Sequence, residues 1–141
     1  MSKQIPATHE RVDDIPASIA SLKTRRVADF LANHFPPNGN GQGLSLGKTT
    51  VVWVAFILSE GDHRLYRVAP WGTTHQRTLR RCLGSEVKPR ELTDDRWATT
   101  LDSLSVAERW GAFARALTQS RRRVYDWHGR VVRVDPTTAK A

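Results

Sequence analysis

The chain contains 141 residues, of which 39% are hydrophobic, and its formal net charge is +8. This length is enough for one domain with a buried core, but not for two full domains. No apolar run reaches the ~18 residues of a membrane span, and a single cysteine, Cys82, excludes an internal disulfide and a cysteine-ligated zinc cluster. Because the first residues also lack the apolar stretch of a secretory signal, we expect a cytoplasmic protein with no membrane partner.

Positive charge is the strongest signal in the composition. The chain has 22 Lys and Arg side chains against 14 Asp and Glu side chains. Such an excess favours binding to polyanions, because the cations of the protein release the counterions that condense on them. The composition therefore predicts a nucleic-acid partner, and the alternative is a protein that is basic by composition alone.

The first third of the chain predicts an arm, one or two helices and a loop. Residues 1–14 are polar and without periodicity, so we expect a flexible N-terminal arm. Apolar residues follow helical spacing over 15–34 with a slip near Lys23, which predicts either one kinked helix or two short ones. Pro and Gly residues over 36–43 then predict a loop. The arm thus precedes a helical domain, which we expect over 15–126.

The longest apolar run, residues 51–58, lies within the segment 46–60. Ser45 is a suitable N-cap, and Gly61 is a stop signal. Because the run is apolar on every side, periodicity alone does not distinguish a buried helix from a buried strand, and its β-branched residues favour a strand. The length and the stop signal favour a helix that other helices surround.

Three more helices are expected after this segment. Pro70 suits a first helical turn and Gly84 suits a C-cap, so a helix is predicted between them. Thr93 is the expected N-cap of a short helix rich in acidic residues at its start. The clearest helix begins at a capping box that starts at Ser105, and its apolar stripe continues for five turns.

Two groups of Arg residues are candidates for binding DNA: Arg77, Arg80 and Arg81, and Arg121, Arg122 and Arg123. The first group recurs at helical spacing beside His75, opposite the apolar side, which suits a helix laid against phosphates. The alternative is a solvated helix face. The second group projects in three directions, so at most two of its members can serve one surface. The alternative there is a cationic helix end that the helix dipole stabilises.

The last patterned segment, residues 131–138, predicts a strand that ends at Asp135. Its valines favour extended backbone, and Pro136 opposes continuation in a central strand. A single strand has no partner here, so we expect it to join a sheet encoded downstream in a complete protein. The predicted fold class is therefore mainly α, with about five helices in an irregular bundle followed by one C-terminal strand.

Five motifs along the chain resemble the N-terminal part of bacterial insertion-sequence transposases of the DDE class. The motifs are His34-Phe35-Pro36-Pro37, Gly43-Leu44-Ser45-Leu46-Gly47, and the segments 57–65, 93–96 and 131–138. No single motif is specific, but their order and spacing match over residues 10–139, which is nearly the whole chain.

The resemblance implies a helical DNA-binding region that leads into a ribonuclease-H-like catalytic domain, of which residues 127–141 would be the start. In that family Asp135 would be the first catalytic aspartate and a ligand of Mg²⁺, and its partners, a second Asp and a Glu, would lie beyond residue 141. One carboxylate in a chain of net charge +8 would hold Mg²⁺ weakly, so we expect no strand cleavage by this chain alone. Pro136 departs from the family, which commonly has a small hydroxyl residue after the aspartate.

Three functions are compatible with the sequence. The first is a DNA-binding fragment of a DDE transposase that recognises transposon ends. The second is a non-enzymatic regulator that occupies those ends or pairs with full-length transposase or with itself. The third is a basic helical interaction module without a role on DNA.

Overall fold

The computed structural model describes residues 9–10, 12–36 and 43–124. Within these ranges the chain is helical and contains no strand, so the mainly α class is confirmed. The helices are α1 (Ile15–Thr24), α2 (Val27–His34), α3 (Leu46–Glu60), α4 (Val68–Thr74), α5 (Gln76–Leu83), α6 (Asp94–Leu104) and α7 (Ala107–Val124), with short 3₁₀ turns η1 (Leu65–Arg67) and η2 (Pro89–Leu92). The predicted strand ending at Asp135 lies outside the described residues.

The described residues form seven α-helices, whereas the sequence predicts about five. Residues 15–34 form two short helices, which is one of the two predicted alternatives, and the helix predicted between Pro70 and Gly84 is divided in two. At each of these boundaries one residue leaves helical backbone angles. Arg26 adopts the left-handed conformation, with φ 54° and ψ 33°, and separates α1 from α2. His75, with φ −106° and ψ 21°, separates α4 from α5. Neither break involves Pro or Gly, which are the residues from which breaks are usually predicted.

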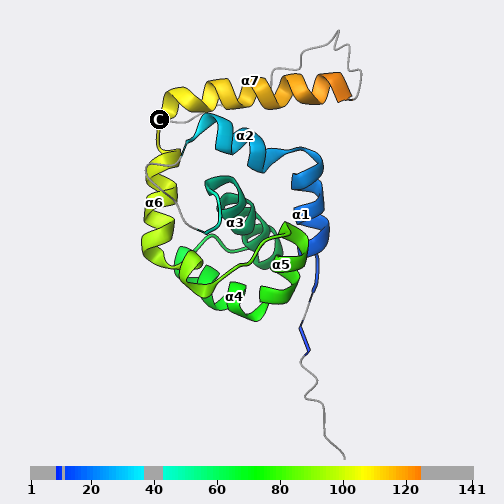
Figure 1. The fold of residues 1–141 in the computed structure, drawn as a ribbon, viewed down its shortest axis with the longest axis vertical. Helices are drawn as coiled ribbons and strands as arrows, with labels where there is room; N and C mark the ends of the chain where they lie inside the picture. Colours follow the sequence, from blue (N-terminus) through cyan, green and yellow to red (C-terminus); the bar gives the residue numbers. More distant parts are fainter. Residues whose placement is uncertain (1–8, 11, 37–42, 125–141) are drawn as a thin grey trace, which may run out of the picture.

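Helix α3 is the centre of the fold, and the other helices surround it (Figure 1). The Ser45 hydroxyl accepts a hydrogen bond from the Lys48 N–H at 3.3 Å, and Gly61 ends the helix with φ 61°. The helix predicted over 46–60 is therefore confirmed, with both of its predicted end residues. Its β-branched residues favour a strand, but the packing of other helices around the segment outweighs that preference.

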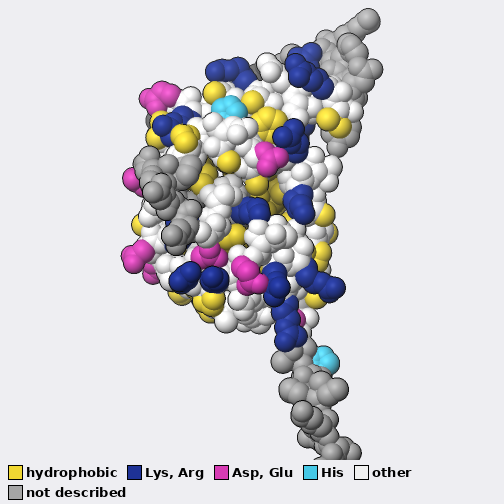
Figure 2. Space-filling view, in the orientation of Figure 1, with side chains coloured by type: hydrophobic (Ala, Val, Ile, Leu, Met, Phe, Trp, Pro, Cys, Tyr) yellow, Lys and Arg dark blue, Asp and Glu magenta, His cyan; other side chains and the backbone are white. Residues whose placement is uncertain are grey.

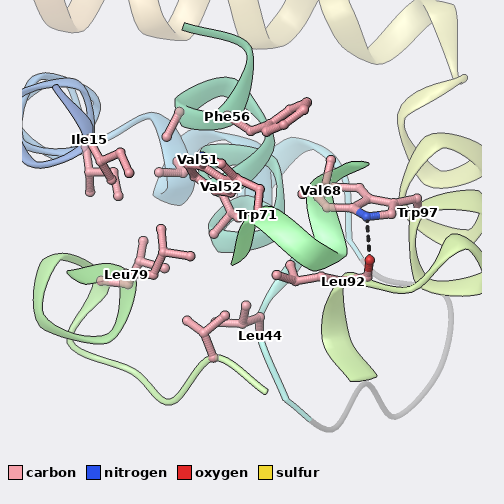
Figure 3. Packing of buried hydrophobic residues seen from close by; sticks show 14 residues of the cluster. Ile15, Leu44, Val51, Val52, Phe56, Val68, Trp71, Leu79, Leu92 and Trp97 are labelled. Atoms are coloured by element: carbon pink, nitrogen blue, oxygen red, sulfur yellow. Dashed lines mark hydrogen bonds between the residues drawn. The ribbon is translucent and has the colours of Figure 1, made fainter. Parts of the chain in front are cut away.

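The main hydrophobic core lies between α3 and the helices around it (Figure 3). Trp97 is fully buried, and its indole N–H donates to the carbonyl of Leu92 at 3.0 Å. Phe56 and Trp71 pack edge to face, with ring centroids 5.4 Å apart. Trp97 therefore packs η2 and α6 against one side of α3, and its buried indole N–H has a hydrogen-bond partner.

A second, smaller cluster holds α7 against α2. The Phe35 ring lies 4.7 Å from the ring of Trp110. Trp110 is nevertheless 40% exposed and Val124 is 73% exposed, so the apolar stripe of α7 is only partly covered in the described structure. The predicted capping box does not form, because the Ser105 hydroxyl donates to the Asp102 carbonyl at 2.7 Å and α7 begins only at Ala107.

Helices α2 and α3 approach so closely that only glycine fits at position 47. A Cβ atom on Gly47 would lie 2.1 Å from the carbonyl oxygen of Ala28, which is a backbone atom in α2. Real Cβ atoms do not approach backbone atoms this closely, so a side chain here would push the two helices apart. The contact also fixes the position of Lys48, the next residue of α3.

We expect Gly47→Ala to lower the free energy of unfolding by about 1–3 kcal/mol, the usual cost of forcing extra volume into a packed core. Gly111→Ala in α7 is the matched control, because its Cβ would meet only the flexible Arg115 side chain at 3.6 Å. The control should raise the free energy of unfolding by roughly 0.5–1 kcal/mol through helix propensity. Urea unfolding measures both values, and equal effects at the two positions would contradict the close α2–α3 contact.

Asp62 fixes the turn that follows α3. Its carboxylate accepts the Arg64 N–H at 3.0 Å and the Arg67 guanidinium at 2.5 Å, while only 8% of the residue is exposed. The hydrogen bond from the Arg64 backbone and the charge of Arg67 lower the pKa of Asp62, although burial acts in the opposite direction. The ionised form is therefore the one that the folded turn requires.

We expect Asp62→Asn to lower the melting temperature at pH 7 and to have a progressively smaller effect as the pH falls below about 4. The pKa of Asp62 is lower in the folded chain than its unfolded value of about 4, so its stabilisation is present above that value and is lost as the pH falls through the folded pKa. Melting temperatures measured from pH 7 to pH 3 test this. Asp102→Asn, at an exposed position, is the control and should leave the pH dependence unchanged. A loss of the same size at every pH would contradict the role of the ionised carboxylate.

Candidate nucleic-acid interface

The three predicted arginines of α5 lie on its exposed side. Arg77, Arg80 and Arg81 are all exposed, whereas Leu79 and Leu83 are buried in the core. The Arg80 guanidinium lies 3.0 Å from the Glu86 carboxylate, but both side chains are more than half exposed, so water screens this ion pair. Arg77 and Arg81 form no ion pair with any described residue. Helix α5 therefore presents cations that are largely available to an anionic partner.

His75 does not lie beside these arginines, so that part of the prediction is wrong. It is only 7% exposed, and its Nδ1 atom lies 2.8 Å from the Trp71 carbonyl oxygen. Its ring packs on the Trp71 ring with centroids 5.0 Å apart. Because His75 occupies the break between α4 and α5, its side chain turns back toward α4 rather than following the exposed side of α5.

The N-terminal end of α5 is capped by a residue from the beginning of the described chain. The Glu10 carboxylate accepts the Thr78 N–H at 2.8 Å. Burial raises the pKa of Glu10, but the hydrogen bonds from Thr78 and from the Arg77 backbone outweigh this effect, so the pKa is lowered. An ionised carboxylate at a helix N-terminus complements the helix dipole. Glu10 thus stabilises the helix turn from which Arg77 projects.

The turn between α1 and α2 adds basic residues that the sequence analysis did not select. Arg25 and Arg26 are exposed there, and the Lys23 ammonium donates to the Cys82 carbonyl at 3.1 Å. This bond and the packing of α1 on α5 bring the turn beside the α5 arginines. Arg26 forms an exposed ion pair with Asp29 at 3.1 Å. The signal was present in the sequence as a run of basic residues, but it coincided with a slip in helical periodicity and was interpreted as a kink or as the boundary between two short helices.

Lys48 is another basic residue that the sequence alone did not single out. It lies in the first turn of α3, and its ammonium hydrogen-bonds to the hydroxyl of Ser85, just after α5. No described carboxylate forms an ion pair with it. We use the name basic face for the cations of these three segments, which are Lys23, Arg25, Arg26, Lys48, Arg77, Arg80 and Arg81.

Figure 2 shows Lys and Arg side chains along the side of the molecule formed by the last part of α7, by α1 and by α5. Fewer Asp and Glu side chains lie among them in this view. In α7, Arg121 is partly buried, whereas Arg122 and Arg123 are exposed. In Figure 1 the C-terminal end of α7 lies apart from helix α5, and α1 lies between them. The structure therefore does not bring the two predicted arginine groups into one cluster.

The described residues contain no metal site of the usual kind. No three His, Cys, Asp or Glu side chains among them come together as ligands. Asp135, the residue expected to bind Mg²⁺, lies outside these residues. Within the same ranges, no helix has both the length and the hydrophobicity needed to cross a membrane.

Comparison with known proteins gives no family for this chain. No family model matches the sequence, and no curated protein or solved structure was found to be similar to it. The geometry of the basic face is thus the basis for a functional proposal.

Proposed function

We propose that this chain binds double-stranded DNA through the basic face and is the N-terminal, DNA-binding portion of a DDE transposase. The observation that supports this most directly is that Lys23 and Lys48, from α1 and α3, bond to the end of α5, whose own arginines are exposed. Within the basic face, only Arg26 and Arg80 pair with carboxylates of the described residues, and both pairs are exposed.

The chemistry of the basic face suits a phosphate backbone better than it suits a small ligand. Its Lys and Arg side chains come from three segments, and only Lys23, Arg26 and Lys48 of them line a hollow, whereas a small-molecule site buries most of its ligand in one concave pocket. Duplex DNA has one negative charge per about 1.7 Å of its axis, so a spread of cations meets several phosphates together. Contacts of this kind orient a protein on DNA but do not read its sequence.

The resemblance to DDE transposases indicates which DNA we expect to be bound and which residues we expect catalysis to need. Transposon ends would be the DNA that is bound, and Asp135 would be the first catalytic aspartate and a ligand of Mg²⁺. Strand cleavage would require the second Asp and the Glu that the resemblance places beyond residue 141, because two-metal catalysis needs several carboxylates around the ions. DNA binding is the activity proposed for residues 1–141.

Fluorescence anisotropy with a labelled duplex of about 30 base pairs tests the proposal. We expect the logarithm of the binding constant to fall linearly with the logarithm of salt concentration, by about 0.9 for each phosphate contacted. The double variant Arg77→Gln/Arg81→Gln should weaken binding roughly 10- to 100-fold at low salt and reduce this slope by about 2, because two phosphate contacts are lost.

Arg90→Gln is the control for this experiment. Arg90 is exposed, but it lies in η2, which packs against α4 and α6 and not on α5. It should change affinity less than about twofold if contacts are confined to the basic face. A flat salt response, or equal losses in the control and the double variant, would favour the basic interaction module without a role on DNA. Protection of transposon ends in the presence of competitor DNA would further support the transposase assignment.

A further inference from the structure

A hollow of about 160 Å³ lies between the α1–α2 turn, the first turns of α3 and the end of α5. Apolar side chains form its floor: Leu22, Val51 and Leu83. Three cations line it as well, namely Lys23, Arg26 and Lys48. We infer that this hollow, here called the phosphate seat, receives one phosphate of the DNA backbone. This inference rests on the proposed function, because it names the contact that fixes how DNA lies on the basic face.

Both lysine ammonium groups are held at the same place in the fold. Lys23 donates to the Cys82 carbonyl at 3.1 Å, and Lys48 hydrogen-bonds to the Ser85 hydroxyl. Cys82 and Ser85 are three residues apart at the end of α5, so the two lysines converge from different helices. An ammonium has three donors, and each of these lysines uses one in these bonds. No carboxylate of the described residues forms an ion pair with either ammonium, although the Ser85 hydroxyl that Lys48 reaches lies in a neighbouring hollow that Glu86 and Glu91 also line.

The charge balance of the seat favours an anion. Asp29 is the one acidic residue that lines the hollow, against three cations. It pairs with Arg26 at 3.1 Å, and the two side chains are 60% and 67% exposed. A pair this exposed is weak, so a phosphate can replace the carboxylate and accept two parallel hydrogen bonds from the guanidinium. The N-terminal end of α3, where Lys48 lies, adds the positive end of a helix dipole.

The continuity of the seat with the basic face favours a backbone phosphate over free phosphate. Lys23 and Lys48 are both bound to the end of α5, the helix that also presents Arg77, Arg80 and Arg81. A DNA strand with one phosphate in the seat would place neighbouring phosphates along α5. The seat thus orients the strand without reading its sequence.

The test compares Lys48→Met with Ser85→Ala in the same anisotropy assay. Both variants remove the hydrogen bond between the two side chains, but only Lys48→Met removes the cation. We expect Lys48→Met to weaken DNA binding roughly 5- to 10-fold at low salt and to reduce the salt slope by about 1. Ser85→Ala should change affinity less than about twofold. Equal losses in both variants would show that Lys48 acts only by holding α3 against α5, and would overturn the seat.

Two further measurements separate this inference from the proposed function. If the wild type binds DNA and Arg77→Gln/Arg81→Gln weakens it while Lys48→Met does not, the seat is wrong and DNA binding stands. If the wild type shows no salt-dependent binding, both proposals fall. Inorganic phosphate alone is the last probe. If it raises the melting temperature of the wild type but not of Lys48→Met, and DNA binding is the same for both, then the hollow binds free phosphate and the backbone seat is overturned.

Discussion

The close contact between the Gly47 position of α3 and the Ala28 carbonyl of α2 is the constraint on which the rest of the structure depends. Helix α3 is apolar on most sides, so every neighbouring helix can bury a face against it, and hydrophobicity alone does not fix their angles. The angle between α2 and α3 is fixed, because their backbones meet at a contact that has no room for a Cβ atom. It also determines the proposed DNA contacts, because Lys48 follows Gly47 and Asp29 follows Ala28. The packing of the core thus places the charged groups that line the phosphate seat.

The ends of α3 were predictable from sequence because local chemistry determines them. Ser45 supplies an acceptor for an otherwise unpaired backbone N–H, and Gly61 adopts a left-handed conformation that other residues disfavour. The breaks at Arg26 and His75 were not predictable in the same way. Arg26 lies where α1 leaves α5 and α2 reaches α7, so the first break depends on tertiary contacts. His75 bonds to the Trp71 carbonyl four residues earlier, and both side chains are buried in the core. A slip in periodicity indicated the first break, but nothing local indicated the second.

The candidate site was predictable only where its residues share one helix. Arg77 and Arg81 are four residues apart, so helical spacing alone places them on one side of α5. Lys23 and Lys48 are distant in sequence, and they line one hollow because each reaches the end of α5 from another helix. No periodicity connects them. Asp135 is the opposite case: its proposed role comes wholly from the resemblance, and the described fold neither supports nor opposes it.

Arg26 illustrates how stability and the proposed function compete at this surface. A non-glycine residue with φ 54° is uncommon and costs roughly 1 kcal/mol or more, and glycine would adopt the same angles without strain. An exposed ion pair with Asp29 offsets little of this cost. Glycine would, however, remove a guanidinium from the rim of the phosphate seat. The Arg26 guanidinium also lies 5.9 Å from the centroid of the Phe30 ring, a contact that favours arginine in the folded chain. If the seat binds DNA as proposed, the strained turn presents the same cation to the phosphate, so one side chain contributes both to the fold and to the proposed binding.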